Sequence, residues 1–132
     1  MEAKNMIEGF MNQLWVEKDI TAIDRFFTTE TIIHSSLRTA TGPHEMRDIV
    51  ERWLEAFPDL HCTWDDWISE KDKVMVRWHA RGTHLGEFLN FPATKNKIHY
   101  MGVSIYRLQD NKIAEYWGIV DMHTLVNQIN GI

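Results

Sequence analysis

An acidic residue near the C-terminus is the first candidate for chemistry in this chain. Asp121 follows the segment 112–120 and precedes an apolar stretch, 122–129. A carboxylate at the mouth of an apolar pocket can remove a proton from a carbon atom next to a carbonyl group. The same position suits a helix N-cap, where Asp accepts hydrogen bonds from free backbone N–H groups. The sequence leaves both roles open for Asp121 and favours the N-cap.

The chain has seven histidines, and two of them are candidates for a role near a pocket. His34 ends a short predicted strand, 31–35, where a neutral imidazole could pass a proton or hold a carbonyl oxygen. A half-buried imidazole bonded to the backbone is an equal alternative. His84 lies in the loop 81–94, and we expect it to orient this loop rather than to touch a ligand. Neither a metal nor a cofactor is expected, because the other histidines show no metal-ligand spacing and no nucleotide-binding motif is present.

Two predicted strands near the C-terminus, 100–108 and 112–120, would bring aromatic and small side chains together. Because side chains alternate along a strand, one face carries Tyr100, Ser104, Tyr106, Tyr116 and Val120. The other face is apolar and carries Met101, Val103, Ile105, Trp117 and Ile119. If the loop has three residues, with Asn111 in the left-handed region, Ser104 lies opposite Tyr116 and Gly102 opposite Gly118.

The face that mixes rings, hydroxyls and glycines suits a pocket better than a plain core. Each aromatic residue alone is more often ordinary core, but as a set facing two glycines that leave space they favour a cavity. The predicted ligand-binding residues are Trp53, Trp78, His84, Tyr100, Ser104, Tyr116 and Gly118. Asp66 is a further candidate acid, although a bend or bulge beside it would expose it, and we expect exposure.

The elements that would position these residues follow from hydrophobic periodicity. Helices are predicted over 6–15, 22–27, 43–57 and 122–129, and strands over 31–35, 60–68, 73–83, 100–108 and 112–120. Thr21 is a candidate N-cap for the second helix, and Pro58 ends the third. Helices followed by antiparallel strands indicate an α+β fold, with the helices on one face of a curved sheet.

Length and composition limit the possible functions. With 132 residues the chain is expected to form a single domain, 1–132, and a hydrophobic fraction of 44% indicates a folded core. The net charge of -5 and the scattered basic residues make nucleic acid an unexpected partner. A single cysteine, no apolar leader and no span of about 20 apolar residues lead us to expect a cytoplasmic protein without a membrane segment.

The loop that follows the second long strand carries a family resemblance. Its sequence has the pattern G-T-H-x-G-x-F-x-x-x-P-x-T over 82–94, and four other pieces agree with it: 56–60, 73–78, 105–107 and 120–122. Together they resemble the SnoaL-like polyketide cyclase and ester cyclase family over nearly the whole chain. The resemblance implies a cone-shaped α+β barrel, shared with nuclear transport factor 2 and ketosteroid isomerase. It also implies a homodimer formed through the outer face of the sheet.

The cyclases of this family close a ring by an intramolecular aldol step without a cofactor. The resemblance implies an acid directly after the tryptophan of the last strand, and often a second acid on the neighbouring strand. This chain has Gly118 and Ser104 at those two positions. Three classes therefore stay open: a cofactor-free enzyme acting on a small apolar carbonyl compound, a ligand-binding module that has lost the base, and a dimerisation module without a cavity.

Overall fold

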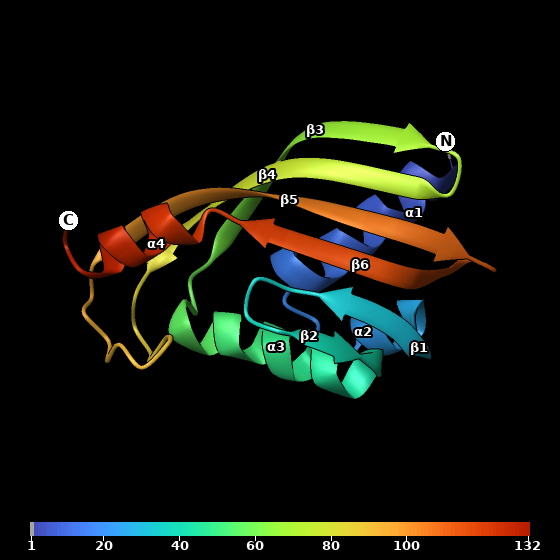
Figure 1. Ribbon diagram of the computed structural model, residues 1–132. Helices are drawn as coiled ribbons and strands as arrows, with labels where there is room; N and C mark the ends of the chain where they lie inside the picture. Colours follow the sequence, from blue (N-terminus) through green and yellow to red (C-terminus); the bar gives the residue numbers. More distant parts are fainter. Residues whose placement is uncertain (1) are drawn as a thin grey trace.

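Three helical segments from the N-terminal half pack against one face of a curved sheet (Figure 1). The computed structural model describes residues 2–132. The helices are α1 (Glu2–Met11), continued by a π-helical turn η1 (Asn12–Val16), α2 (Ala22–Phe26), α3 (Gly42–Ala56) and α4 (Met122–Ile129). The strands are β1 (Phe27–His34), β2 (Thr39–Thr41), β3 (His61–Glu70), β4 (Lys73–Thr83), β5 (Lys97–Gln109) and β6 (Lys112–Val120).

The strand order in the sheet is β2-β1-β6-β5-β4-β3. All neighbouring pairs are antiparallel except β1 and β6, which are parallel. The predicted antiparallel sheet therefore contains one parallel pair, because β1 comes from the helical half of the chain and joins the last strand. The sheet stays open, with β2 and β3 at its edges, and the predicted α+β class is confirmed.

Two helix ends differ from the sequence prediction. The first helix widens into the π-helical turn η1, which hydrophobic spacing did not predict. Thr21 occupies the predicted N-cap position of α2, but its side chain makes no capping hydrogen bond, because its hydroxyl donates to Asp19 instead. The start of α3 agrees with the prediction: Gly42 has a positive φ of 87°, which favours glycine, and Pro43 follows it in the first turn.

The hairpin between β5 and β6 has a different register from the predicted one. Its turn has two residues, Asp110 and Asn111, both with positive φ, and Gln109 pairs with Lys112. A bulge in β6 then shifts the register once more, so that Ser104 pairs with Gly118 rather than with Tyr116. Each shift alone would turn every later side chain to the opposite face. The two shifts together preserve the predicted faces.

The core lies between the sheet and the three N-terminal helical segments. Ile7, Phe10 and Leu14 of the first helical segment are fully buried, as is Tyr106 of β5. The rings of Phe10 and Tyr106 meet edge to face with centroids 6.0 Å apart. The amphipathic pattern of the first helix and the alternation of β5 therefore bury the faces that the sequence predicts.

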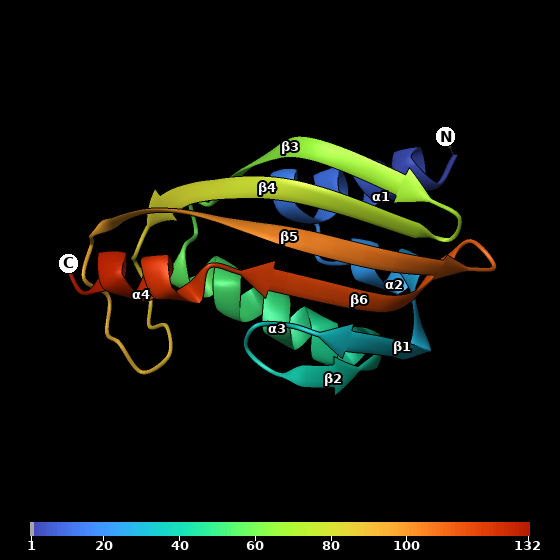
Figure 2. The same cartoon turned by 45° about the horizontal axis from the view of Figure 1, so that its top comes forward.

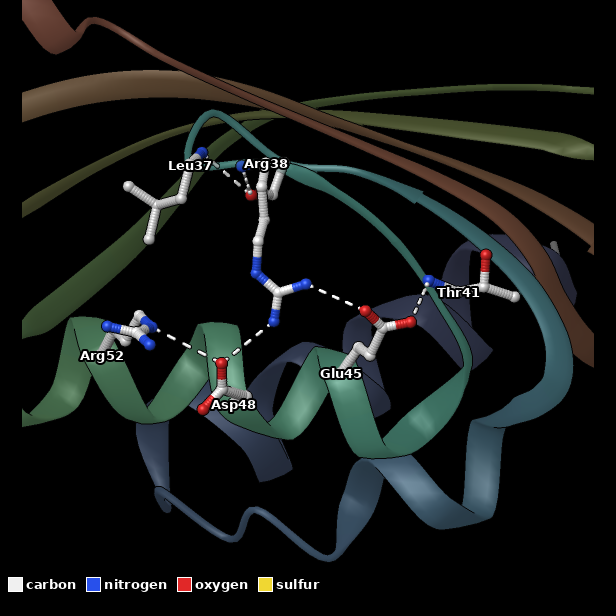
Figure 3. A network of polar contacts seen from close by, with 7 residues as sticks. Leu37, Arg38, Thr41, Glu45, Asp48 and Arg52 are labelled. Carbon is white, nitrogen blue, oxygen red and sulfur yellow. Dashed lines mark hydrogen bonds and ion pairs between the residues drawn. The ribbon is translucent and has the colours of Figure 1, made fainter.

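The turn between β1 and β2 is held to α3 by charged side chains, as Figure 3 shows. The Arg38 guanidinium contacts Glu45 and Asp48, with N–O distances of 3.0 Å in each case. Asp48 is also 3.5 Å from Arg52, and Glu45 accepts a hydrogen bond from the Thr41 backbone N–H. These contacts fix the edge of the sheet over the helix.

The other face of β3–β6 is turned away from the three N-terminal helical segments and faces the viewer in Figure 2. We call it the outer face; it carries Met101, Val103, Ile105, Trp117 and Ile119. Met101 and Ile119 are 45% and 55% exposed, and α4 lies at one end of the sheet.

No helix within residues 2–132 is long and apolar enough to cross a membrane.

Candidate functional site: an aromatic cavity

A small cavity opens between the sheet and the helices. Its volume is about 50 Å³. The lining side chains come from the α1–η1 segment, α3, the start of β3 and the strands β4, β5 and β6. They are mostly aromatic or aliphatic: Met11, Trp15, Trp53, Leu60, Cys62, Trp64, Trp78, Tyr100, Ser104, Tyr116 and Val120. The structure thus brings together five predicted ligand-binding residues: Trp53, Trp78, Tyr100, Ser104 and Tyr116.

Hydrogen bonds and ring contacts fix several of the aromatic walls. The Trp64 indole N–H donates to the Asn12 side chain at 2.8 Å, and the Trp78 indole N–H donates to the Ser104 hydroxyl at 3.0 Å. Trp53 stacks on Tyr100, with ring centroids 5.8 Å apart and an interplanar angle of 26°. Such parallel rings offer a flat apolar surface to a ligand.

The two glycines of the cavity face do not leave the expected empty space. A Cβ atom at Gly102 would lie 2.5 Å from Cζ2 of Trp78, and one at Gly118 would lie 2.2 Å from Oη of Tyr116. An aromatic ring therefore already covers each glycine. This close packing explains why the cavity is small, and Gly118 itself is covered by the Tyr116 side chain.

The cavity lining contains no charged group within the described residues. No Asp, Glu, His, Lys or Arg belongs to it. Its ionisable side chains are Cys62, Tyr100 and Tyr116. Burial raises the pKa of Cys62 and of Tyr116 to about 12 each, and raises the pKa of Tyr100 well above its usual value. These groups are therefore neutral at physiological pH, and the hydroxyls can donate hydrogen bonds.

Asp121 lies outside the cavity lining, at the N-terminus of α4. Its carboxylate accepts a hydrogen bond from the Thr124 backbone N–H at 3.1 Å and another from the Thr124 hydroxyl at 2.7 Å. These bonds hold the pKa of Asp121 below its usual value. The geometry is that of the N-cap favoured from the sequence, and the role of general base stays a prediction.

His34 also lies away from the cavity. It pairs with Trp117 in the parallel ladder and stacks on that ring, with centroids 5.3 Å apart. Its Nε2 atom is 2.7 Å from the Glu115 carboxylate, and the hydrogen bond from His34 holds the pKa of Glu115 below its usual value. The structure therefore places His34 on the outer face, where its proposed contact with a ligand stays untested.

Asp66 is exposed, as expected. The ladder between β3 and β4 has a bulge between Trp64 and Asp66. The Asp66 side chain is 62% exposed and pairs with Arg77. The bulge turns this carboxylate away from the cavity that Trp64 lines.

His84 joins the two ends of the loop that carries the recognised sequence pattern. It is fully buried, and its Nδ1 atom accepts a hydrogen bond from the Thr94 backbone N–H at 3.2 Å. Gly86 packs against the end of α3, where an added Cβ would lie 2.2 Å from the Glu55 carbonyl oxygen. Phe88 then contacts Trp53, with ring centroids 4.9 Å apart. His84 thus lies outside the cavity lining, in a loop that supports the cavity wall at Trp53.

Sequence reasoning placed Val120 on the pocket face but did not name five other lining residues: Met11, Trp15, Leu60, Cys62 and Trp64. Alternation from Cys62 to Trp64 places both on one face of β3, and this signal could have identified them. No pattern in the sequence indicated that Trp15 lines the cavity, because the position of this side chain depends on the π-helical turn.

Comparisons with known proteins agree with this geometry. The family model described as SnoaL-like polyketide cyclase matches residues 5–129. No curated protein sequence matches the chain.

Solved structures share the fold over nearly the whole chain. AclR from Streptomyces galilaeus, provisionally described as a hydroxylase, is 25% identical with a TM-score of 0.86 over 99% of this chain and 82% of its own. TsrD from Streptomyces laurentii is 25% identical, with a TM-score of 0.84 over 97% of this chain and 94% of its own. IdmH from Streptomyces antibioticus, provisionally described as a polyketide cyclase, is 23% identical with a TM-score of 0.82 over 100% of both chains.

Proposed function

Because this chain belongs to the SnoaL-like polyketide cyclase family, we propose that it binds a small apolar carbonyl compound in the aromatic cavity and promotes ring closure there. The ligand is of the polyketide or ester type. The cavity carries this proposal, because its lining combines flat aromatic surfaces with neutral hydroxyl groups and no charge. Such a lining favours a neutral, flat ligand with hydrogen-bond acceptors.

The proposed reaction is an intramolecular aldol closure that needs no cofactor. A base removes a proton from the carbon next to one carbonyl group, and the resulting enolate carbon forms a bond with a second carbonyl carbon. The oxygen of that second carbonyl then takes up a proton. The cavity contributes by holding the ligand folded, so that the two carbons are close. Asp121 and His34 remain the proposed proton acceptors, although neither lines the cavity.

A ligand of this kind needs more room than the cavity offers. Ligand pockets have volumes of about 300–1,000 Å³, and this cavity has about 50 Å³. Lining side chains must therefore move when a ligand enters. Trp15 is the best candidate, because it is half-buried and its indole makes no hydrogen bond within residues 2–132, whereas Trp64 and Trp78 are each held by one.

A non-catalytic ligand-binding role is the second candidate. It is favoured by the absence of any carboxylate or imidazole from the described cavity lining. Turnover separates the two functions: an aryl β-keto ester that can close by an aldol step is incubated with the protein, and the ring-closed product is measured by chromatography. Catalysed closure supports the cyclase, whereas binding of the ester without closure supports the binding module.

The binding site itself is tested with two neighbouring positions on β3. Cys62 lines the cavity, whereas Thr63 pairs with His79 on the other face of the strand. We expect Cys62→Phe to weaken the binding of acetophenone, a small aryl ketone, by about tenfold or more in calorimetric titration, because the ring fills the cavity. Thr63→Phe should leave the affinity unchanged. Equal affinity of the wild type and Cys62→Phe would show that the ketone binds elsewhere.

We also propose that two copies of the chain associate through the outer face. Apolar residues gather there, and Met101 and Ile119 are largely exposed. Contiguous apolar surface of this kind usually marks an interface, and a symmetric dimer would cover it with the same surface of a second copy.

A further inference from the structure

Tyr116 lies where a side chain of residue 118 would otherwise begin. A Cβ atom at Gly118 would be 2.2 Å from Oη and 2.8 Å from Cζ of Tyr116. No two such carbon and oxygen atoms can be this close without a shift, so the Tyr116 ring and a side chain at 118 exclude each other. The glycine therefore allows the tyrosine to lean along its own strand over Gly118, and Tyr116 is one of the side chains that line the cavity.

Ser104 and Trp78 provide hydrogen-bonding groups on the side of the sheet where Tyr116 lies. Ser104 pairs with Gly118 across the ladder, and the tyrosine hydroxyl lies over Gly118. The Ser104 oxygen already accepts the Trp78 indole N–H at 3.0 Å. Its own proton is then available to donate, and the Ser104 hydroxyl acts to lower the pKa of both Tyr116 and Tyr106 against the larger effect of burial. A phenolic hydroxyl can accept a hydrogen bond and also donate one, so Tyr116 can accept from Ser104 and donate its own proton into the cavity.

The polar groups of the lining are suited to a hydrogen-bond acceptor rather than to an anion or a cation. No charged side chain within the described residues lines the cavity. A tyrosine hydroxyl in such surroundings keeps its proton, because burial disfavours the phenolate. A donor held in an apolar site stabilises negative charge that develops on a carbonyl oxygen.

From this arrangement we infer that the Tyr116 hydroxyl donates a hydrogen bond to the carbonyl oxygen of the ligand and that Gly118 is required to place it. This inference rests on the proposed function, because it assumes that a carbonyl compound occupies the cavity. It adds the contact that orients the carbonyl group and stabilises the enolate oxygen.

The test compares two tyrosines that differ in their access to the cavity. Tyr116 and Tyr106 are direct partners on β6 and β5, with ring centroids 5.1 Å apart, but only Tyr116 lines the cavity. Tyr116→Phe and Tyr106→Phe each remove one buried hydroxyl and keep the ring. The probes are acetophenone and α-methylstyrene, in which a methylene group replaces the carbonyl oxygen.

We expect Tyr116→Phe to weaken acetophenone binding by about tenfold, because one buried hydrogen bond is lost, and to leave α-methylstyrene binding unchanged. Tyr106→Phe should change neither affinity. The infrared carbonyl band of bound acetophenone provides a direct readout. It should lie at lower frequency in the wild type than in Tyr116→Phe, because a hydrogen bond weakens the carbonyl bond.

The outcomes separate this inference from the proposed function. If Tyr116→Phe weakens both probes equally, or leaves the carbonyl band of bound acetophenone in place, the hydroxyl has a structural role and the inference is wrong. If Cys62→Phe still blocks the ketone in that case, the cavity remains the binding site. If the wild type binds neither probe, both the proposed function and the inference fail.

Discussion

At the level of single residues, the contact between Gly118 and Tyr116 determines how much space the cavity has. Because Gly118 has no side chain, the Tyr116 ring can lie over it, and this ring fills the volume there. From the sequence, two glycines facing aromatic residues indicated empty space. Alternation fixes which face a side chain occupies, but the direction in which a tyrosine leans depends on packing that the sequence pattern does not contain.

We expect Gly118→Ala to lower the free energy of unfolding by about 1–3 kcal/mol, because the added methyl group displaces the buried Tyr116 ring. Gly9→Ala is the matched control. Gly9 lies in α1, and an added Cβ would meet no heavy atom within 4 Å apart from its chain neighbours and the nearby backbone of its own helix, so alanine should stabilise the helix by up to about 1 kcal/mol. Urea unfolding measures both changes. A neutral or stabilising Gly118→Ala would mean that Tyr116 does not lie over Gly118.

Asp121 has two proposed roles, which a pair of substitutions separates. Asn caps helices about as well as Asp does, but it cannot act as a base. If Asp121 is the base, Asp121→Asn lowers turnover of a ring-closing ester by about 10²- to 10⁴-fold and leaves the melting temperature nearly unchanged. If it is only the cap seen in its bonds to Thr124, Asp121→Asn keeps full turnover, and only Asp121→Ala lowers the melting temperature. Full turnover in Asp121→Asn would remove this residue from the mechanism.

At the level of elements, the ends of β4, β6 and α4 coincide with the predicted ends, whereas the hairpin register does not. The bounds follow from hydrophobic periodicity, which is a local property. The register depends on whether Asp110 joins Asn111 in the left-handed region and on a bulge in β6. Asp tolerates this region, so the Asp-Asn pair could have indicated the shorter turn.

The side of His34 could not be derived from the sequence for a related reason. Its orientation is set by the parallel pairing of β1 with β6, which places Ile33 beside Tyr116 and His34 beside Trp117. This pairing joins segments that are distant in the chain. The pattern of a short strand shows that its side chains alternate between two faces. It does not show which of the two faces is turned toward the cavity.

The loop held by His84 should make stability depend on pH. Burial lowers the pKa of His84 from its ordinary value of 6.5, and Nε2 has no hydrogen-bond partner within residues 2–132. The unfolded chain therefore binds a proton more readily than the folded one below about pH 6.5. The contribution of neutral His84 to the free energy of unfolding is fully present above that pH and is lost as the pH falls toward 5.

Melting temperatures between pH 7 and pH 5 measure this effect. The wild type should lose stability across the interval, and His84→Gln should show a smaller slope, even if its melting temperature is lower throughout. His44→Gln, at an exposed position, should keep the wild-type slope. The carboxylates with lowered pKa values titrate below this interval, so they do not account for the change. Identical slopes in the wild type and in His84→Gln would exclude His84 as the cause.

At the level of the whole molecule, the sequence predicted a concave sheet covered by helices, and the structure has this arrangement. It did not predict the size of the cavity. That size results from the π-helical turn that carries Trp15, the leaning of Tyr116 and the placement of Trp78 over Gly102. Each of these is a packing outcome that joins two or three elements, so a pattern read along one element cannot give it.

The outer face yields a prediction for the state of the protein in solution. We expect a dimer at micromolar concentration, measured by sedimentation, because apolar side chains of β5 and β6 are exposed there. Ile119→Glu should give a monomer, because a carboxylate buried without a partner in the interface is strongly unfavourable. Leu85→Glu is the matched control: Leu85 is 48% exposed, similar to the 55% of Ile119, but lies in the loop beside α3 rather than on the sheet. A wild-type monomer, or a dimer that Leu85→Glu rather than Ile119→Glu disrupts, would show that the outer face is not the interface.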